Sequence, residues 1–506
     1  MPVRKPKDPD RSPDLPHDWI SRQIARVAPF RFEHTLPIND WQFKRAQYIA
    51  FGEYEFIDTE WQPIQPGEVW GGNDVTVFFE TEFDFPISFI GSDTYLDIDM
   101  DGGETQLSIN GYPWQGLDFS RSLAPLAEHA RQPGKIKLEM EAFVINFPYD
   151  DRRNDEKELH LFKRDQLVKL DRTIDDWLND AQFVFEVYLS FYHSDADIEL
   201  EDFLRHHLEE ACRLIHPSIS TIKEAREAAT QARKYLQKNV FSSDAFQKTG
   251  WIDIIGHSHL DIIYLWPIKE TFRKNCRTTT NMLSLMREYP DFKYSQSQPY
   301  LYEELKVMYP KVFEEVKLRI QEGRWETIGA MYIEPDGNVV GPESLVRQIL
   351  LGKQFLRQEF GIESRTVWLP DVFGVMYTLP QILKKSGIDY FSTVKLKIWA
   401  DTNPFPYNTF WWRGPDGTDI LTHFPATHFG KNLDAETVRQ HWHDFQDKNT
   451  VGESLFVYGL ADGGGGPTRE EIERGRKLIN FPGLPTGKVD TVENFFARLE
   501  QQTENL

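Results

Sequence analysis

From Trp251 onward, short apolar segments alternate with longer segments of helical periodicity, and this alternation constrains the fold more than any other feature of the sequence. The apolar segments are typical of strands because they are short and bounded by polar turns. They are residues 251–255, 292–296, 326–333, 366–369, 390–395, 420–424 and 455–458. Strands that alternate with helices predict a parallel α/β sheet or barrel, in which ligands bind at the carboxyl ends of the strands.

The first of these strands ends in the sequence Gly-His-Ser-His-Leu-Asp, residues 256–261. His259 and Asp261 are two residues apart, so in extended backbone both side chains point to the same side and can share one cation. An isolated pair of this kind is also explained by hydrogen bonding at the end of a strand. The residues at the other strand ends therefore have to decide between the two interpretations.

Polar side chains also follow the other expected strands. They are Glu334, Asp336, Asp371, His423, His428 and Asp462. Taken singly, Asp371 can cap the turn that follows it, and Asp336 can close an Asx turn before Gly337. Taken together, several carboxylates at one face of a sheet repel one another and need a compensating cation. Carboxylate oxygens with one or two imidazoles and no thiolate suit zinc or another divalent first-row ion.

The N-terminal half is organised differently, because period-two alternation there gives way to helical periodicity. The alternating part predicts an antiparallel β-domain with a tight hairpin turn at Asn110-Gly111. The predicted domains are a weakly ordered lead-in (1–30), the antiparallel β-domain (31–148), a helical linker segment (149–248) and the α/β catalytic domain (249–506).

Composition excludes several classes of partner and site. The formal net charge of −22 disfavours nucleic acid and anionic membrane surfaces, because both would repel the chain. Cys212 and Cys276 are the only cysteines, so neither a disulfide framework nor a thiolate metal cluster can form, and the reducing cytoplasm is the expected compartment. The sequence has no apolar signal segment and no run of about eighteen apolar residues, so we expect neither export by an obvious signal nor a membrane span.

Several motifs stand in a fixed order along the chain. They are HSHLD (257–261), EGRWE (322–326), EPD (334–336), ESLVRQ (343–348), LPDVFG (369–374), FPYNTF (405–410) and DGGGGPT (462–468). Together they resemble the successive motifs of the α-mannosidases of glycoside hydrolase family 38, and the cytosolic or vacuolar and bacterial branch is the most similar. Residues 71–76 and 110–118 are similar to the leading domain of that branch, so the resemblance covers most of the chain.

The resemblance implies a (β/α)7-like barrel that hydrolyses α-mannosidic bonds in oligomannosides with retention, using one zinc ion. By motif, His259 and Asp261 match zinc ligands, and Asp371 matches the residue that is both zinc ligand and nucleophile. A retaining enzyme needs a second carboxyl as acid/base, for which the candidates are Asp462 and then Asp336. The residues implied in sugar binding are Tyr264, Tyr332, Asp336 and Phe373. Both tyrosines stand where the family usually has tryptophan, and they keep an aromatic face.

The resemblance also implies a fourth zinc ligand, a histidine well beyond the glycine run, but no histidine follows Asp462. We therefore expect the chain to be the N-terminal portion of a longer enzyme or half of a split one, with weak zinc binding and slow turnover on its own. It would then need C-terminal domains or a partner chain, and its uncovered apolar surface would favour a homo-oligomer. His423 or His428 is the alternative fourth ligand. The rival functions are a catalytically impaired mannose-binding fragment and a metal-dependent carbohydrate deacetylase.

Overall fold

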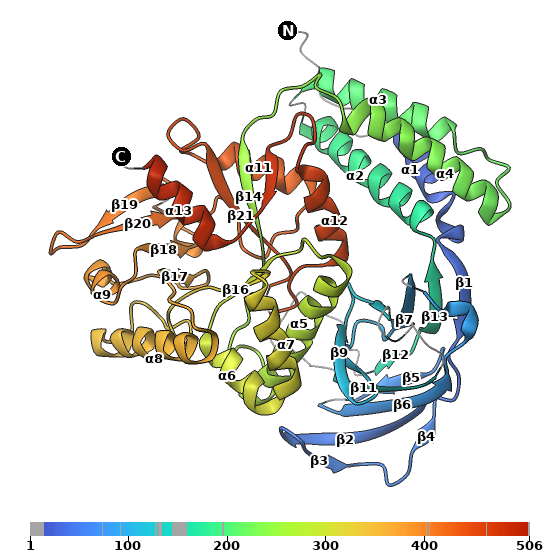
Figure 1. Cartoon of the computed structure of the whole chain (residues 1–506), viewed down its shortest axis with the longest axis horizontal. Helices are drawn as coiled ribbons and strands as arrows, with labels where there is room; N and C mark the ends of the chain where they lie inside the picture. Colours follow the sequence, from blue (N-terminus) through green and yellow to red (C-terminus); the bar gives the residue numbers. More distant parts are fainter. Residues whose placement is uncertain are drawn as a thin grey trace. The chain divides into compact units, whose positions relative to one another are not determined.

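The computed structural model describes residues 15–72, 74–91, 93–126, 129, 134–143, 159–194, 197–400, 402–403, 405–461 and 463–503 (Figure 1). The chain divides into two compact units. The first comprises Met1–Thr35, Lys169–Lys248 and Asn480–Leu484, and the second Leu36–Val168, Thr249–Ile479 and Pro485–Leu506. Among the described residues, no helix combines the length and the apolar character that crossing a membrane requires.

The first unit is built from helices. They are α1 (Leu15–Ala25), α2 (Arg172–Ser194), α3 (Ile198–Arg213) and α4 (Ile222–Leu236). Figure 1 shows α2, α3 and α4 side by side in a bundle. Asp197 caps α3 by accepting the N–H of Leu200, and Thr221 begins α4 with a capping box. Leu204 and Ala229 are fully buried on the apolar faces of α3 and α4, which confirms the helical periodicity predicted for these segments.

A β region accounts for most of the chain before α2. Its strands are β1 (Phe32–Pro37), β2 (Gln42–Ala50), β3 (Glu53–Phe56), β4 (Gln62–Pro63), β5 (Val69–Gly71), β6 (Thr76–Asp84), β7 (Thr94–Asp99), β8 (Glu104–Ile109), β9 (Tyr112–Leu117), β10 (Leu123–Pro125), β11 (Lys135–Phe143), β12 (Leu159–Leu161) and β13 (Arg164–Leu170). The largest sheet is antiparallel, with strand order β3-β2-β6-β11-β8-β9 and β4 paired to β2. A second sheet has the order β1-β13-β7-β10, and β12 pairs with β5.

The hairpin between β8 and β9 turns at Asn110-Gly111, as predicted. Both residues have positive φ, 52° for Asn110 and 75° for Gly111, which a type I′ hairpin turn requires. Along β11, buried residues alternate with less buried ones, as expected of a strand with one face on a core. The antiparallel character predicted from period-two alternation is therefore confirmed.

An α/β region follows the helical segment. Its strands are β14 (Trp251–His257), β15 (Tyr294–Gln296), β16 (Trp325–Thr327), β17 (Thr366–Leu369), β18 (Tyr390–Thr393), β19 (Thr409–Arg413), β20 (Asp419–His423), β21 (Glu453–Tyr458) and β22 (Thr486–Val489). Its helices are α5 (Ile268–Glu288), α6 (Pro299–Met308), α7 (Pro310–Gln321), α8 (Pro342–Phe360), α9 (Leu379–Lys385), α10 (Lys395–Ile398), α11 (Ala435–Asp444), α12 (Arg469–Leu478) and α13 (Val492–Gln502).

The strands of this region form two sheets. One has the order β16-β15-β14-β21, with β22 also on β14, and its pairs are parallel. The other has the order β17-β18-β20-β19, parallel except for β19. A backbone hydrogen bond from Ala330 N–H to Thr366 O, 3.1 Å long, links the chain beyond β16 to β17. The predicted α/β class is confirmed, whereas a closed (β/α)7 barrel is not, because the pairing across the described strands is split between these sheets.

Two local expectations differ from the structure. The sequence of residues 302–321 is helical in character and predicts one helix, but the structure has two, α6 and α7, which meet at Tyr309. Pro310 lacks a backbone N–H and disfavours helical backbone at the residue before it, so the first helix ends there. Strands β19 and β22 were not expected; β19 pairs antiparallel with β20 at the edge of its sheet, and β22 pairs parallel with β14.

Arg121, from the β region, fastens the glycine run of the α/β region. Its Nη2 donates to the carbonyl oxygens of Gly465, Gly466 and Pro467 at 2.8, 2.7 and 2.9 Å, and its Nη1 donates to Asp118 at 2.7 Å. Only 7% of the Arg121 side chain is exposed. Water therefore cannot easily reach these carbonyl oxygens and hydrogen-bond to them in place of the guanidinium. The glycine run 463–466 is therefore positioned by Arg121 of the β region as well as by its own turns.

We expect Arg121→Met to destabilise the chain by about 3 kcal/mol, because it leaves buried carbonyls without a donor and Asp118 without its cation. Urea unfolding measures the loss as a lower midpoint. The matched control is Arg413→Met, which breaks an ion pair with Asp419 whose arginine is 72% exposed and which should cost less than about 1 kcal/mol. Equal losses of unfolding free energy in the two variants would contradict the stabilising role of Arg121.

Candidate active site

His257 and His259 leave the end of β14 in different environments, although they are two residues apart. The His257 ring is buried, with Nδ1 2.8 Å from the carbonyl oxygen of Ser295 and Nε2 3.4 Å from the indole nitrogen of Trp368. The N–H of Nδ1 must donate to Ser295, and Nε2 accepts from Trp368. Burial lowers the pKa of His257 to about 3, so this ring is a neutral packing element that joins β14 to β15 and β17.

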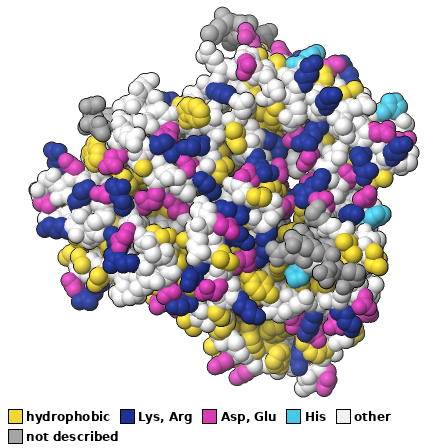
Figure 2. All heavy atoms as spheres, in the orientation of Figure 1, with side chains coloured by type: hydrophobic (Ala, Val, Ile, Leu, Met, Phe, Trp, Pro, Cys, Tyr) yellow, Lys and Arg dark blue, Asp and Glu magenta, His cyan; other side chains and the backbone are white. Residues whose placement is uncertain are grey.

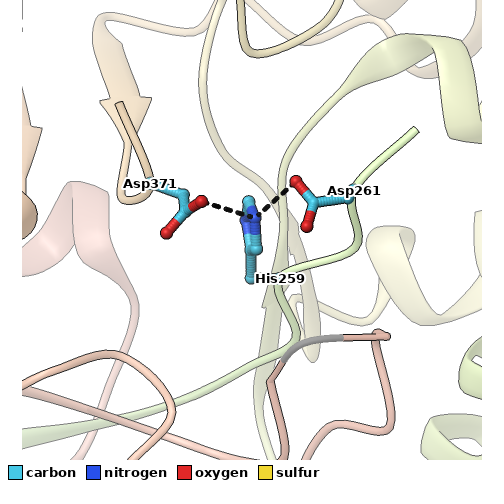
Figure 3. A group of neighbouring side chains, drawn as sticks. All are labelled: His259, Asp261 and Asp371. Atoms are coloured by element: carbon cyan, nitrogen blue, oxygen red, sulfur yellow. Dashed lines mark hydrogen bonds and ion pairs between the residues drawn. The ribbon is translucent and has the colours of Figure 1, made fainter. Parts of the chain in front are cut away.

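His259 stands between two carboxylates, as Figure 3 shows. Its Nε2 is 3.3 Å from Asp261 Oδ1 and 3.8 Å from Asp371 Oδ2. Each of the three residues offers an atom of the kind that binds metals, and these atoms lie within 4.8 Å of one another. His259 and Asp261 follow β14 and Asp371 follows β17, so the carboxyl ends of strands from the two sheets bring together residues that the sequence predicts at strand ends.

A third carboxylate, Glu334, faces the other nitrogen of this ring. Glu334 Oε1 is 3.3 Å from His259 Nδ1, and only 8% of the Glu334 side chain is exposed. Burial opposes protonation of His259, but the charges of Glu334 and Asp261 raise its pKa well above the ordinary value. Glu334 was among the polar residues expected at the strand ends, but it was not assigned a specific role in the site; its place in the motif Glu-Pro-Asp was the available signal.

Lys395 supplies the positive charge beside Asp371, and it was not predicted from the sequence. Its Nζ lies 2.7 Å from Asp371 Oδ1, the side chain is 8% exposed, and the ammonium is 3.8 Å from the centre of the Phe373 ring. Lys395 begins α10 directly after β18, so a charged residue at a strand end was the signal. The ion pair leaves Asp371 Oδ2 on the side of His259.

These residues fit a divalent cation. One imidazole nitrogen and two carboxylate oxygens form a donor set suited to zinc or a similar first-row ion. Three carboxylates around His259 outnumber the single lysine, and Glu334 Oε2 is buried without a hydrogen-bond partner among the described residues. With Nε2 bound to a metal, the N–H of Nδ1 would donate to Glu334, which is the usual support of a ligating histidine.

Comparison with known proteins identifies the family. The model of the glycosyl hydrolases family 38 N-terminal domain matches residues 250–506, just over half of the chain. The chain belongs to glycosyl hydrolase family 38. This match covers the whole of the α/β region and therefore every residue of the group around His259.

The sequence similarity to curated relatives extends beyond the α/β region into the β region. Human alpha-mannosidase 2C1 is 29% identical over 462 residues, which cover 89% of this chain and 43% of the human protein. The alpha-mannosidase of Saccharomyces cerevisiae is 35% identical over 306 residues, 56% of this chain and 27% of the yeast protein. Among solved structures, an alpha-mannosidase from Enterococcus faecalis V583 covers 51% of this chain at 21% identity and a TM-score of 0.45. The chain spans less than half the length of these curated relatives.

The other residues predicted for this family 38 site are in three different places. Asp336 and Phe373 line a cavity of about 240 Å³ together with the group around His259. Tyr264 lines a second cavity, of about 470 Å³. Tyr332 is among the lining residues of neither; its hydroxyl donates to Glu303, and its ring lies edge-on to Tyr300. Asp462 lies outside the described residues.

Asp336 also has the structural role that its sequence context suggested. Its Oδ1 accepts the backbone N–H groups of Asn338 at 2.8 Å and Val339 at 3.0 Å, which closes an Asx turn. The side chain is exposed. An Asp336 carboxylate tied to two backbone donors is a weaker acid/base candidate than a free carboxyl would be.

Neither alternative histidine ligand belongs to the group around His259 in the described structure. His423 is buried against Phe495 with Nδ1 2.9 Å from the Thr409 hydroxyl, and burial lowers its pKa to about 3. His428 stacks on Phe429 and accepts the N–H of Gly430 through Nδ1. His423 is therefore a core residue, and His428 stacks on Phe429, whose ring is 4.9 Å from that of His259.

Proposed function

We propose that this chain carries the mannose-cleaving site of a zinc-dependent α-mannosidase that acts on oligomannosides with retention. The observation that carries the proposal is the position of Asp371, whose two oxygens face Lys395 on one side and His259 on the other. Asp371 is the nucleophile, and His259, Asp261 and Asp371 are the residues that would hold zinc. Zinc in such a site supplies Lewis acidity and a hold on hydroxyl groups of the sugar.

The chain's own residues then account for the reaction. The carboxylate of Asp371 attacks the anomeric carbon and forms an ester bond while the bond to the leaving oxygen breaks. Asp462 is our acid/base candidate: it protonates the leaving oxygen and later removes a proton from the water that opens the ester. Two inversions at the same carbon give retention. Lys395 holds one oxygen of Asp371 at 2.7 Å and so fixes the direction of the other.

Aromatic and acidic residues at the rim supply sugar contacts. Phe373 is 71% exposed and Tyr264 56% exposed, so both offer open ring faces to a pyranose. Asp336 stands at the edge of the cavity that contains the group around His259. For Tyr332 we retain a role in substrate binding as a proposal, although its hydroxyl is engaged by Glu303.

The family match favours hydrolysis of mannosides over the rival carbohydrate deacetylase. Incubating the 506-residue chain with zinc and an aryl α-mannoside tests the proposal, and proton NMR of the first sugar released shows its anomeric form. We expect α-mannose to be released first. If β-mannose is released first, the reaction inverts and Asp371 is excluded as a covalent nucleophile. If the sugar binds but is not cleaved, the catalytically impaired mannose-binding fragment is favoured.

The substitution Lys395→Met removes the positive charge of this side chain and keeps most of its volume. Removing a cation that touches Asp371 should tighten zinc binding about tenfold, because a divalent ion no longer meets a like charge nearby, while turnover falls. Competition with a chelating dye measures the zinc affinity. The control is Lys397→Met, which breaks a hydrogen bond to the carbonyl oxygen of Phe405 away from the group around His259 and should leave zinc affinity unchanged. Weaker zinc binding in Lys395→Met would show that the lysine supports the metal site instead of competing with it.

A further inference from the structure

The larger of the two cavities lies between the β region and the α/β region, and the proposed function does not use it. Its volume is about 470 Å³, within the range of about 300–1,000 Å³ typical of small-molecule sites. Gly102, Gly116 and Phe119 line it from the β region, and Trp266, Lys274 and Asn281 line it from the α/β region. All of these residues belong to the same compact unit.

One loop contributes lining residues both to this cavity and to the cavity of the candidate active site. Asp261, Ile262 and Ile263 line the cavity around His259, and the next residue, Tyr264, lines the larger cavity. Ala461 and Gly463 also line the larger cavity. They flank Asp462 in the sequence, the residue proposed to protonate the leaving oxygen. The larger cavity is thus lined by both sequence neighbours of the proposed acid.

The charged groups of the cavity are already paired. Lys274 Nζ donates to both oxygens of Glu104, at 2.6 and 2.8 Å, and Arg277 binds the same carboxylate. Arg277 also binds Glu270 at 3.0 Å. A ligand that carried a net charge would have to compete with these pairs. A neutral ligand rich in hydroxyl groups can instead use their remaining donors and acceptors.

An unsatisfied amide and exposed aromatic rings complete the surface. Asn281 is 3% exposed, and its Oδ1 has no hydrogen-bond partner among the described residues. The amide lies beside Gly116, where a Cβ would be 3.0 Å from Nδ2, so the glycine keeps this part of the wall open. Phe119 is 71% exposed and Tyr264 56% exposed. A buried acceptor without a donor is costly, and a ligand hydroxyl would satisfy it.

We propose that this cavity binds a sugar unit on the leaving-group side of the scissile bond, so that the β region selects oligosaccharides over simple mannosides. This inference rests on the proposed function. Phe119 provides an apolar face for the pyranose ring, and Asn281 accepts one of its hydroxyl groups. The paired charges of Lys274, Arg277 and Glu104 explain why the unit is a neutral sugar and not a phosphorylated or acidic one.

The test compares two ligands that are not cleaved during the measurement. Methyl α-mannoside occupies the cavity around His259 alone, whereas sulfur-linked α-mannobiosides, with 1,2, 1,3 and 1,6 linkages, reach both cavities. NMR titration of the zinc-supplied chain gives the two affinities, and we expect at least one mannobioside to bind about tenfold more tightly. Phe119→Ala and Asn281→Leu should each reduce that ratio about threefold or more. Phe119 is exposed, so its variant is not expected to disturb the fold.

Phe56→Ala is the matched control, since Phe56 is a 54% exposed phenylalanine of β3 that lines neither cavity. Its ratio should equal that of the parent. If methyl α-mannoside binds but no mannobioside gains affinity, or if the gain survives both variants, this inference fails and the proposed function stands. If methyl α-mannoside does not bind at all, the proposed function itself is overturned.

Discussion

Replacing Asp371 with asparagine is expected to abolish hydrolysis of an aryl α-mannoside, with a loss of at least about a thousandfold in kcat. The amide has nearly the volume of the carboxylate, but it lacks the charge that attacks the anomeric carbon. The fold should survive, because the amide oxygen can still accept from Lys395, which now lies 2.7 Å from Oδ1. Initial rates with the aryl mannoside measure the loss, and thermal melting followed by circular dichroism checks the fold.

The matched control is Asp416→Asn, a change of the same kind at an exposed aspartate that bonds Gln381 and Thr418 on the surface. Its rate should equal that of the parent. A rate for Asp371→Asn within about tenfold of the parent would remove Asp371 as the nucleophile.

Replacing His259 with alanine is expected to lower both zinc content and activity. The imidazole is the single nitrogen donor of the group, and it stands between Asp261 and Asp371 (Figure 3), so no described neighbour takes its place. We expect a loss of at least about a hundredfold in zinc affinity. Elemental analysis after dialysis against buffer of defined zinc concentration measures the metal bound per chain.

Two other histidine variants serve as controls for this test. His423→Ala and His428→Ala should keep their zinc, because neither ring belongs to the group around His259 in the described structure. Unchanged zinc in His259→Ala would remove this residue from the site. Loss of zinc in His428→Ala would show instead that the loop before Phe429 moves to complete the coordination.

The surface adds little to this assignment. On the face shown in Figure 2, described Lys and Arg side chains are interspersed with Asp and Glu side chains, so the net charge of −22 is not gathered into one region there. The distribution of charge on this face therefore does not indicate a binding site.

Much of the site was predictable because its signals are local. An apolar run followed by polar residues marks the end of a strand, and parallel strands end at the same edge of a sheet. That rule marked His259, Asp261 and Asp371 as strand-end residues, and the structure brings them together although β14 and β17 belong to different sheets and more than a hundred residues separate Asp261 from Asp371. The same kind of local signal predicted the hairpin at Asn110-Gly111 and the helices of the first unit.

Other parts of the site depend on contacts that no local pattern contains. Glu334 and Lys395 each stand at a strand end, but many charged residues do, and only packing decides which of them turn inward. Tyr332 was grouped with the sugar-binding residues, yet its hydroxyl is held by Glu303 on α6. Likewise, strand composition predicted parallel α/β structure but not the division into two sheets.

By itself, then, the sequence determined the class of each region, the family and the three residues that face one another at the strand ends, because periodicity and motif spacing act over short distances. The tertiary structure alone decided the counter-ion of Asp371, the support of His259 and the cavity beside Tyr264. The cavity arises where Glu104 and Phe119 of the β region meet the α/β region, whereas Lys395 and Glu334 come to the site from other strand ends of the α/β region. Contacts between segments so distant in the chain follow from the packing of whole elements, which no single segment encodes.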